Sequence, residues 1–242
     1  MSQASAMILA AGRGERMRPL TDQCPKPLLE VLGKPLMQYH LEALGRAGCD
    51  DVVVNTAWLG QQIEDRFGQQ FAFDTGHVQS TVRQLRISYS HEGRDFGGAL
   101  ETAGGIARAL PILADVFWLV AGDVYAPGFA FSRAAMDRFA AGGKLAHILL
   151  VPNPPHNFRG DFGLGEDGMA LNDADLRYTY STIGLYRKSL FDSLPAGNPQ
   201  GLRVALAPLL RAAMDRRQVS AGLYRGAWTD VGTPERLGQL NG

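Results

Sequence analysis

Short continuous runs of apolar residues alternate with helical patterns between residues 6 and 151. Such runs predict strands that are buried on both faces of a sheet, because neither side of the strand is polar. These strands are predicted at 6–11, 51–56, 116–121 and 145–151, and an alternation of apolar and polar residues predicts another at 85–90. The predicted helices are 35–48, 59–67, 99–110 and 132–141. The alternation predicts an α/β fold with a largely parallel sheet and helices on both faces.

The C-terminal part of the chain has a different pattern. Residues 152–186 are rich in Gly, Asn and Asp and end in a run of β-branched and aromatic residues, which predicts short strands and a hairpin over one edge of the sheet. A helix is predicted over 204–216 and a strand end at 228–232. Residues 69–84 are polar and of low complexity, so we expect them to form a mobile surface loop.

The fold class also predicts where a ligand binds. In doubly wound sheets, ligands sit at the carboxyl ends of the parallel strands. The loops that follow Ala11, Thr56, Ala121 and Val151 are therefore expected to line the site.

The charges of the chain cancel, since 24 Lys and Arg residues balance 24 Asp and Glu residues. A neutral chain is a poor candidate for binding nucleic acid or a membrane surface, although it can hold a local basic pocket. Two cysteines are too few for a disulfide framework, and no apolar run reaches the ~20 residues of a membrane-spanning helix. The N-terminal segment lacks a basic region, so we expect no signal peptide and a cytoplasmic location.

A glycine-rich turn directly follows the first predicted strand. Glycines let backbone N–H groups approach an anion closely, so this turn suggests a phosphate site. It departs from the dinucleotide fingerprint, because Met17 replaces the third glycine, and from the P-loop, because neither Gly-Lys pair precedes Ser or Thr. Phosphate binding is favoured over a solvated basic loop because basic residues outnumber acidic ones across 13–34. The basic residues are Arg13, Arg16, Arg18, Lys26 and Lys34.

Several short motifs occur in a fixed order along nearly the whole chain. They are L-A-A-G-x-G-x-R-M-x-P-L-T at 9–21, P-K-P-L at 25–28, G-K-P-L at 33–36, E-T-A-G-G at 101–105, G-D at 122–123 and W-x-D-x-G-T at 228–233. This order resembles the signature of the sugar-phosphate nucleotidyltransferases. The resemblance implies a Rossmann-like nucleotidyltransferase fold, with a mostly parallel twisted central sheet, helices on both faces and a small β-hairpin sugar-binding region. It also implies a single domain over 1–242, in which 6–125 bind the nucleotide and 145–232 bind the sugar phosphate.

The resemblance implies transfer of a nucleotidyl group from a nucleoside triphosphate to a sugar 1-phosphate, with release of pyrophosphate. One branch of this family is resembled more closely, through a longer similarity at 6–21, A-W-L-G-Q-Q-I-E at 57–64 and R-G-D-F at 159–162. This finer resemblance implies UTP and N-acetylmuramic acid 1-phosphate as the expected substrates, in cell-wall sugar recycling. Such catalysis depends on positioning and charge neutralisation, and Mg²⁺ is the expected cofactor because it bridges phosphate oxygens.

The site residues are carried over from the same resemblance. Arg16, Lys26 and Asp123 are the expected catalytic residues, and Asp123 and Asp230 the expected Mg²⁺ ligands. The expected nucleotide-binding residues are Ala11, Gly12, Gly14, Glu15, Arg16, Lys26, Gly104 and Gly105, and the expected sugar-phosphate-binding residues are Asn153, Asp161 and Thr182.

Some of these positions have simpler explanations when taken alone. Asp123 is typical of a turn after Gly122, and Asp230 of a helix cap. The ordered motifs favour metal ligation for both. Gly104 and Gly105 fit a base contact and a packing contact equally well. Trp58 fits the core better than a ligand platform.

The chain departs from the family pattern in two places. Ala121 stands where close relatives have Asn, which puts one contact to the sugar ring in doubt, and the E-E-K-P segment of the wider family is absent, with N-D-A-D at 172–175 near its place. The alternatives are a mannose-1-phosphate guanylyltransferase, another hexose-1-phosphate nucleotidyltransferase, or a catalytically silent nucleotide-sugar sensor. The presence of Arg16, Lys26, Asp123 and Asp230 favours an active enzyme. We expect a monomer or a weak homodimer.

Overall fold

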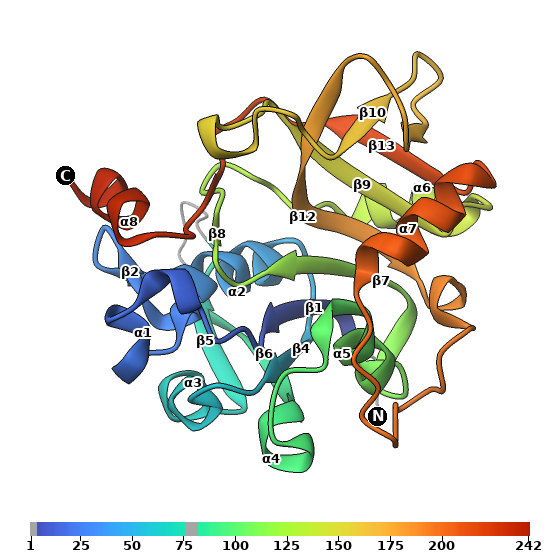
Figure 1. Cartoon of the computed structure of the whole chain (residues 1–242). Coiled ribbons are helices and arrows are strands. Elements are labelled where there is room, and N and C mark those ends of the chain that lie inside the picture. Colours follow the sequence, from blue (N-terminus) through green and yellow to red (C-terminus); the bar gives the residue numbers. More distant parts are fainter. Residues whose placement is uncertain (1–3, 76–81) are drawn as a thin grey trace.

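The computed structural model describes residues 4–75 and 82–242, and its centre is a ten-stranded mixed sheet (Figure 1). The strand order is β11-β10-β12-β7-β1-β4-β6-β5, and β9 pairs with both β12 and β13. The strands are β1 (Ala4–Ala10), β4 (Asp51–Thr56), β5 (Gln70–Asp74), β6 (Val82–His91), β7 (Leu113–Ala121), β9 (Ala146–Val151), β10 (Phe162–Leu164), β11 (Ala170–Leu171), β12 (Arg177–Arg187) and β13 (Val219–Leu223).

The N-terminal part of the sheet is parallel, as the sequence predicts. β1 pairs in parallel with β4 and β7, and β4 pairs in parallel with β6. Met7 of β1 packs into the hydrophobic core on one face of the sheet, and Ile8 packs into the core on the other face. A strand buried on both faces needs apolar residues at consecutive positions, which explains the unbroken apolar run.

Helices cover both faces. On one face lie α5 (Glu101–Ala109) and α7 (Leu206–Asp215), and on the other lie α2 (Leu36–Arg46), α3 (Gly60–Phe67) and α6 (Arg133–Ala141). The sequence places all five close to their observed bounds. Ser132 begins α6 by accepting a hydrogen bond from the Ala135 N–H at 3.2 Å, as an N-cap does.

Short elements join the large ones. Four of them form two small antiparallel pairs, β2 with β3 and β8 with β14. Their bounds, with the remaining helices, are α1 (Leu20–Gln23), α4 (Glu92–Phe96), α8 (Pro234–Asn241), β2 (Glu30–Val31), β3 (Lys34–Pro35), β8 (Val124–Tyr125), β14 (Thr229–Asp230), and the 3-10 turns η1 (Glu15–Met17), η2 (Lys26–Leu28), η3 (Pro155–Asn157) and η4 (Lys188–Phe191).

Two predicted features are wrong in part. The predicted loop over 69–84 contains β5, which pairs with the start of β6, and its residues 76–81 lie outside the described part of the chain. The predicted edge hairpin exists only as β10 and β11, because the run that follows becomes β12 and inserts between β7 and β9. Ile183, Leu185 and Tyr186 are fully buried there, so this strand belongs to the interior of the sheet.

Within the described ranges, none of the helices combines the length and the apolar character that a membrane crossing requires.

Candidate active site

A cavity of about 680 Å³ opens at the carboxyl ends of β1, β4 and β7. Its walls come from both parts of the sheet, the one around β1 and the one around β12 (Figure 1). The loops after Ala11 and Ala121 line it, as predicted, and β4 contributes Asn55. The residues that directly follow Val151 are not among its lining residues, and Phe162, Tyr180 and Thr182 of β10 and β12 form that wall.

The glycine-rich loop forms one wall of the cavity. Gly12 lines the cavity, and the position that a Cβ would occupy there is open space. Gly14 has φ +69°, a left-handed conformation that glycine adopts without strain, and it begins η1. The Thr21 hydroxyl donates to the Gly14 carbonyl at 2.8 Å and fixes this turn. The loop therefore presents backbone to the cavity, as an anion-binding loop requires.

Lys26 and Asp123 meet at this cavity from distant parts of the sequence. Lys26 lies in η2, and its Nζ donates to the Asp123 carboxylate just beyond the end of β7. Only 12% of the Lys26 side chain is exposed, so its charge is held in place. A fixed ammonium group at the end of a parallel strand is suited to neutralising a phosphate.

Asp230 is brought next to Asp123 by the pairing of β14 with β8. Asp230 lies opposite Val124, and the Val231 N–H donates to the Asp123 carbonyl at 2.9 Å. Arg236 Nη1 donates to Asp230 Oδ2 at 2.6 Å. His156 Nε2 lies 2.8 Å from Asp230 Oδ1 and 3.0 Å from Arg236 Nη1. If this nitrogen accepts from Arg236, Oδ1 is a buried oxygen without a donor.

This donor set fits Mg²⁺ better than a metal that is enclosed by protein ligands. Among the residues that the structure describes, no group of three or more His, Cys, Asp or Glu forms a closed site. Mg²⁺ prefers oxygen ligands and keeps several positions for water and substrate phosphates. Asp123 in the cavity wall, with Asp230 next to it, matches that preference.

His40 fixes the strand that follows Asp123. It lies in α2, is 3% exposed, and its Nε2 donates to the Val124 carbonyl at 2.7 Å. Burial lowers the pKa of His40 to about 4, against the opposing effects of this hydrogen bond and of the Asp123 charge. His40 is therefore neutral at physiological pH, with its proton on Nε2.

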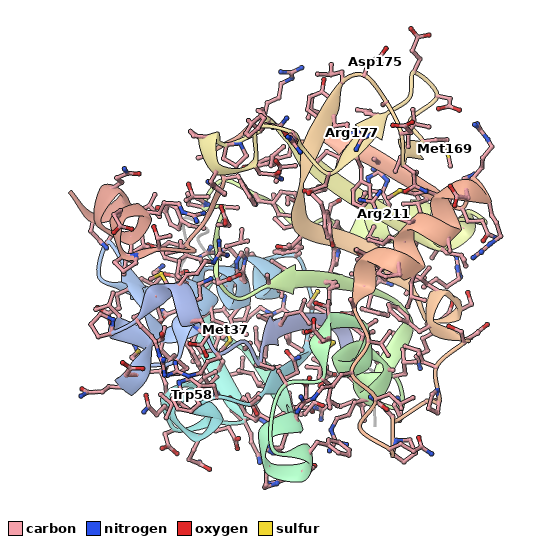
Figure 2. All side chains as sticks on the ribbon, in the orientation of Figure 1. Met37, Trp58, Met169, Asp175, Arg177 and Arg211 are labelled. Carbon is pink, nitrogen blue, oxygen red and sulfur yellow. The ribbon has the colours of Figure 1, made fainter. Side chains whose placement is uncertain are left out.

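Arg13 is a lining residue to which the sequence alone gave no role beyond the basic cluster. Its guanidinium lies 3.7 Å from the centre of the Trp58 ring, and it donates to the Thr21 carbonyl and to Asp22 at 2.8 and 2.7 Å. Trp58 Nε1 donates to the same carbonyl at 2.8 Å, and Figure 2 shows Trp58 between α1 and α3. The core position expected for Trp58 is wrong, because the residue is half-buried and fastens the glycine-rich loop to the segment after β4.

Comparison with known proteins identifies the class of this site. The Nucleotidyl transferase family model matches residues 5–167, which include the glycine-rich loop, Lys26 and Asp123. The chain belongs to this family. An N-acetylmuramate alpha-1-phosphate uridylyltransferase of Neisseria meningitidis serogroup B is 44% identical over 96% of this chain and 94% of its own. Another protein of that name, from Caulobacter vibrioides, is 31% identical over 97% of this chain and 95% of its own.

Solved structures agree on the fold of this nucleotidyltransferase. A Bacillus anthracis protein described as a glucose-1-phosphate thymidylyltransferase superposes with a TM-score of 0.72. The match covers 98% of this chain and 93% of that one at 18% sequence identity. The predicted α/β nucleotidyltransferase fold, with its mixed central sheet, is confirmed.

The cavity of the nucleotidyltransferase brings together several of the predicted site residues. They are Ala11, Gly12, Lys26, Asp123 and Thr182. Thr182, which has φ +61°, lies where the pairing of β12 with β9 shifts register and lines the cavity. Glu15 and Arg16 are exposed on η1, and their contacts with the triphosphate stay predictions.

Gly104 and Gly105 are closely packed against other parts of the protein. Both are buried in α5. A Cβ at Gly104 would overlap the Leu202 carbonyl oxygen, and one at Gly105 would overlap Glu92 Oε1. The space next to each glycine that a side chain would occupy is filled by the protein itself, and the contact of these positions with a base stays a prediction.

Asn153 and Asp161 make hydrogen bonds within the protein beside the cavity. Asn153 Nδ2 donates to the Arg177 carbonyl at 2.9 Å, and Asp161 Oδ2 accepts from the Tyr180 N–H at 2.8 Å. Asp161 thereby anchors the backbone of Tyr180, which lines the cavity. Their direct contacts with a sugar phosphate stay predictions.

Sequence reasoning missed the apolar wall of the cavity. Its side chains come from β10, β12 and α7, namely Phe162, Tyr180, Leu206 and Leu210. They are spaced over about 50 residues without a shared motif, and only the packing of α7 against the sheet brings them together.

Proposed function

We propose that this enzyme transfers the uridylyl group of UTP to N-acetylmuramic acid 1-phosphate, giving the UDP-sugar and pyrophosphate. The observation that carries the chemistry is the meeting of Lys26 and Asp123 beside the glycine-rich loop, in one cavity with room for two substrates. The choice of substrates rests on the two uridylyltransferases that are similar along almost the whole chain.

In the proposed reaction, a phosphate oxygen of the sugar 1-phosphate attacks the α-phosphorus of UTP. A new P–O bond forms, the bond to the β-phosphate oxygen breaks, and pyrophosphate leaves. Two anions must approach each other, so the site has to neutralise charge and align the reacting groups. Lys26 supplies a fixed positive charge at that point, and the backbone of Gly12 receives phosphate oxygens. Arg16 holds the departing pyrophosphate.

Asp123 and Asp230 would hold a Mg²⁺ ion. The metal would supply Lewis-acid stabilisation of phosphate charge when it is bound. His40 keeps the backbone of β8 in place by its hydrogen bond to Val124, and Arg236 keeps the Asp230 carboxylate oriented. Both carboxylates are thus preset before substrate arrives.

The apolar wall favours a sugar that carries hydrophobic substituents. Phe162 and Tyr180 line the cavity together with Leu206 and Leu210. An N-acetyl methyl group and a lactyl methyl group gain from burial against such a wall, whereas the hydroxyls of glucose or mannose lose water there.

The proposed function assigns a substrate to each part of the chain. Residues 6–125 hold the nucleotide and 145–232 hold the sugar phosphate within one domain. The enzyme works in the cytoplasm, where nucleoside triphosphates are available, as a monomer or a weak homodimer.

The test is a pyrophosphate-release assay with four nucleoside triphosphates against a panel of sugar 1-phosphates. The proposal predicts the highest kcat/KM for UTP with N-acetylmuramic acid 1-phosphate, a lower value for dTTP and the lowest for GTP. A highest value for GTP with mannose 1-phosphate would overturn the choice of substrates and favour the guanylyltransferase alternative.

A further inference from the structure

A buried carboxylate that the proposed mechanism does not use, Glu92, is among the lining residues of the cavity. Glu92 is the first residue of α4 and is 1% exposed. Burial raises the pKa of Glu92, and the hydrogen bonds that it accepts oppose that rise. A buried acid is costly unless its oxygens are satisfied, so the partners of Glu92 indicate why it is there.

Both oxygens of Glu92 are satisfied by neutral donors. The Leu100 N–H donates to Oε2 at 2.7 Å, and Asn55 Nδ2 donates to Oε1 at 2.6 Å. Asn55 is itself 3% exposed, and its Oδ1 accepts from the Ala10 N–H at 2.8 Å. These bonds form one chain from the end of β1, through the end of β4, to the residue before α5.

Glu92 sets the donor-to-acceptor direction of this series of hydrogen bonds. A carboxylate can only accept, so it turns the NH₂ end of the Asn55 amide toward itself. The carbonyl end of Asn55 then faces Ala10, whose N–H has an acceptor for that reason. Ala10 directly precedes Ala11 and Gly12 in the wall of the cavity.

The other end of this series of hydrogen bonds holds a second lining segment of the cavity. Leu100 precedes Glu101, which lines the cavity and has φ +60°, a strained conformation for a residue with a side chain. Such strain persists only where the surroundings fix the backbone, and the bond from Leu100 to Glu92 is one such fixing contact.

Gly105 is explained by the same network. A Cβ at this position would overlap Glu92 Oε1 and lie 2.9 Å from Asn55 Nδ2. The second glycine of E-T-A-G-G therefore leaves room for the bond between Glu92 and Asn55.

We propose that Glu92 is a positioning residue of the transfer reaction, which fixes the glycine-rich loop and the Ala99–Thr102 wall at the spacing that the nucleoside triphosphate requires. The proposal rests on the proposed function for the identity of the nucleotide. It predicts that changes in the network weaken nucleotide binding and leave sugar-phosphate binding unchanged.

Exchanging the roles of two residues provides the test. In Glu92→Gln, the new NH₂ group must face either the Leu100 N–H or the Asn55 amide, so a buried donor loses its acceptor. In Asn55→Asp, two carboxylates face each other. In the double variant Asn55→Asp/Glu92→Gln, the new amide at position 92 accepts from the Leu100 N–H and donates to the new carboxylate at position 55. That carboxylate also accepts from the Ala10 N–H, so every hydrogen bond is restored with one negative charge, as in the native protein.

The measurement is the Kd of UTP by calorimetry in Mg²⁺, with KM values for both substrates and thermal melts. We expect each single variant to weaken UTP binding by about tenfold, which is about 1.4 kcal/mol, and the double variant to return within about threefold of the native value. Glu42→Gln is the matched control, because Glu42 is also a buried carboxylate but pairs with Lys34 and Arg46 away from this cavity. It should lower the melting temperature without changing the Kd of UTP.

Gly105→Ala serves if Glu92→Gln does not fold, and it should also weaken UTP binding. Single variants that melt earlier but bind UTP as the native protein does would overturn the proposal, as would a double variant no better than either single one. Because the Kd is measured without sugar phosphate, weaker UTP binding that the exchange restores would support the role of Glu92 even if N-acetylmuramic acid 1-phosphate proved to be the wrong acceptor.

Discussion

The neutral state of buried His40 makes the stability of the enzyme depend on pH in a calculable way. The pKa of His40 is about 4 in the folded chain, against 6.5 for a free side chain. Between these values the unfolded chain binds a proton that the folded chain does not. The contribution is therefore fully present above pH 6.5 and is lost as the pH falls toward 4.

Integrating the difference between the two pKa values gives a loss of about 2–3 kcal/mol in the free energy of unfolding between about pH 7.5 and about pH 4.5. The perturbation that isolates it is His40→Gln, because the amide nitrogen of Gln can still donate to the Val124 carbonyl but does not titrate. The variant should be less stable at neutral pH, since the ring leaves a gap in the core. Its disadvantage should shrink by the same amount in acid.

The assay is urea unfolding of both proteins at several pH values, with the difference in unfolding free energy plotted against pH. Other carboxylates titrate in this range, but they are the same in both proteins and cancel in the difference. A difference that stays constant from neutral pH to about pH 4.5 would refute the reasoning, because His40 would then be protonated in the folded state as easily as in the unfolded one.

The remaining predictions concern the metal site, the reacting charges and one glycine. Excess chelator should abolish pyrophosphate release and Mg²⁺ should restore it, and full activity in chelator would contradict the role of Asp123 and Asp230. Asp123→Asn and Lys26→Ala should each lower kcat on the order of 10²-fold or more while the melting temperature changes little. Raising Mg²⁺ should partly rescue only the Asp123 variant, and near-normal kcat of Asp123→Asn at low Mg²⁺ would return that residue to a turn-forming role. Gly104→Ala should lower stability by about 1–3 kcal/mol, because its Cβ meets the Leu202 carbonyl, without changing the KM of UTP. A raised KM with an unchanged melt would instead support a base contact.

The sequence pattern predicted the parallel part of the fold well, because β1 and β7 carry unbroken apolar runs and β6 shows the apolar–polar alternation of a strand. The pattern did not predict the position of a strand that pairs with strands distant in the sequence. In the sequence, β12 resembles an irregular hairpin segment because Gly184 interrupts its pattern, and the structure has a register shift in its pairing with β9 between Tyr180 and Gly184. Its position between β7 and β9 follows from the burial of Ile183 and Tyr186, which no local pattern reveals.

The site residues divide in the same way. The ordered motifs of the sequence predicted the site roles of Gly12, Lys26 and Asp123. The structure places all three in one cavity. The sequence did not predict the hydrogen-bond network of Ala10, Asn55 and Glu92, because these residues belong to separate elements that only the fold brings together. Gly105 was visible as a motif residue, but the sequence does not reveal that Glu92 Oε1 lies where its side chain would be.

Nucleotidyl transfer at this cavity can be observed by following the α-phosphorus of UTP. UTP labelled at the α-phosphorus is incubated with N-acetylmuramic acid 1-phosphate, Mg²⁺ and the native enzyme, and the labelled products are separated. The account predicts that the label enters the UDP-sugar in equal amount to the pyrophosphate released, and that Lys26→Ala forms this product on the order of 10²-fold more slowly. Label released as UMP, or label that stays in UTP although the nucleotide binds, would contradict nucleotidyl transfer to this sugar phosphate at the cavity.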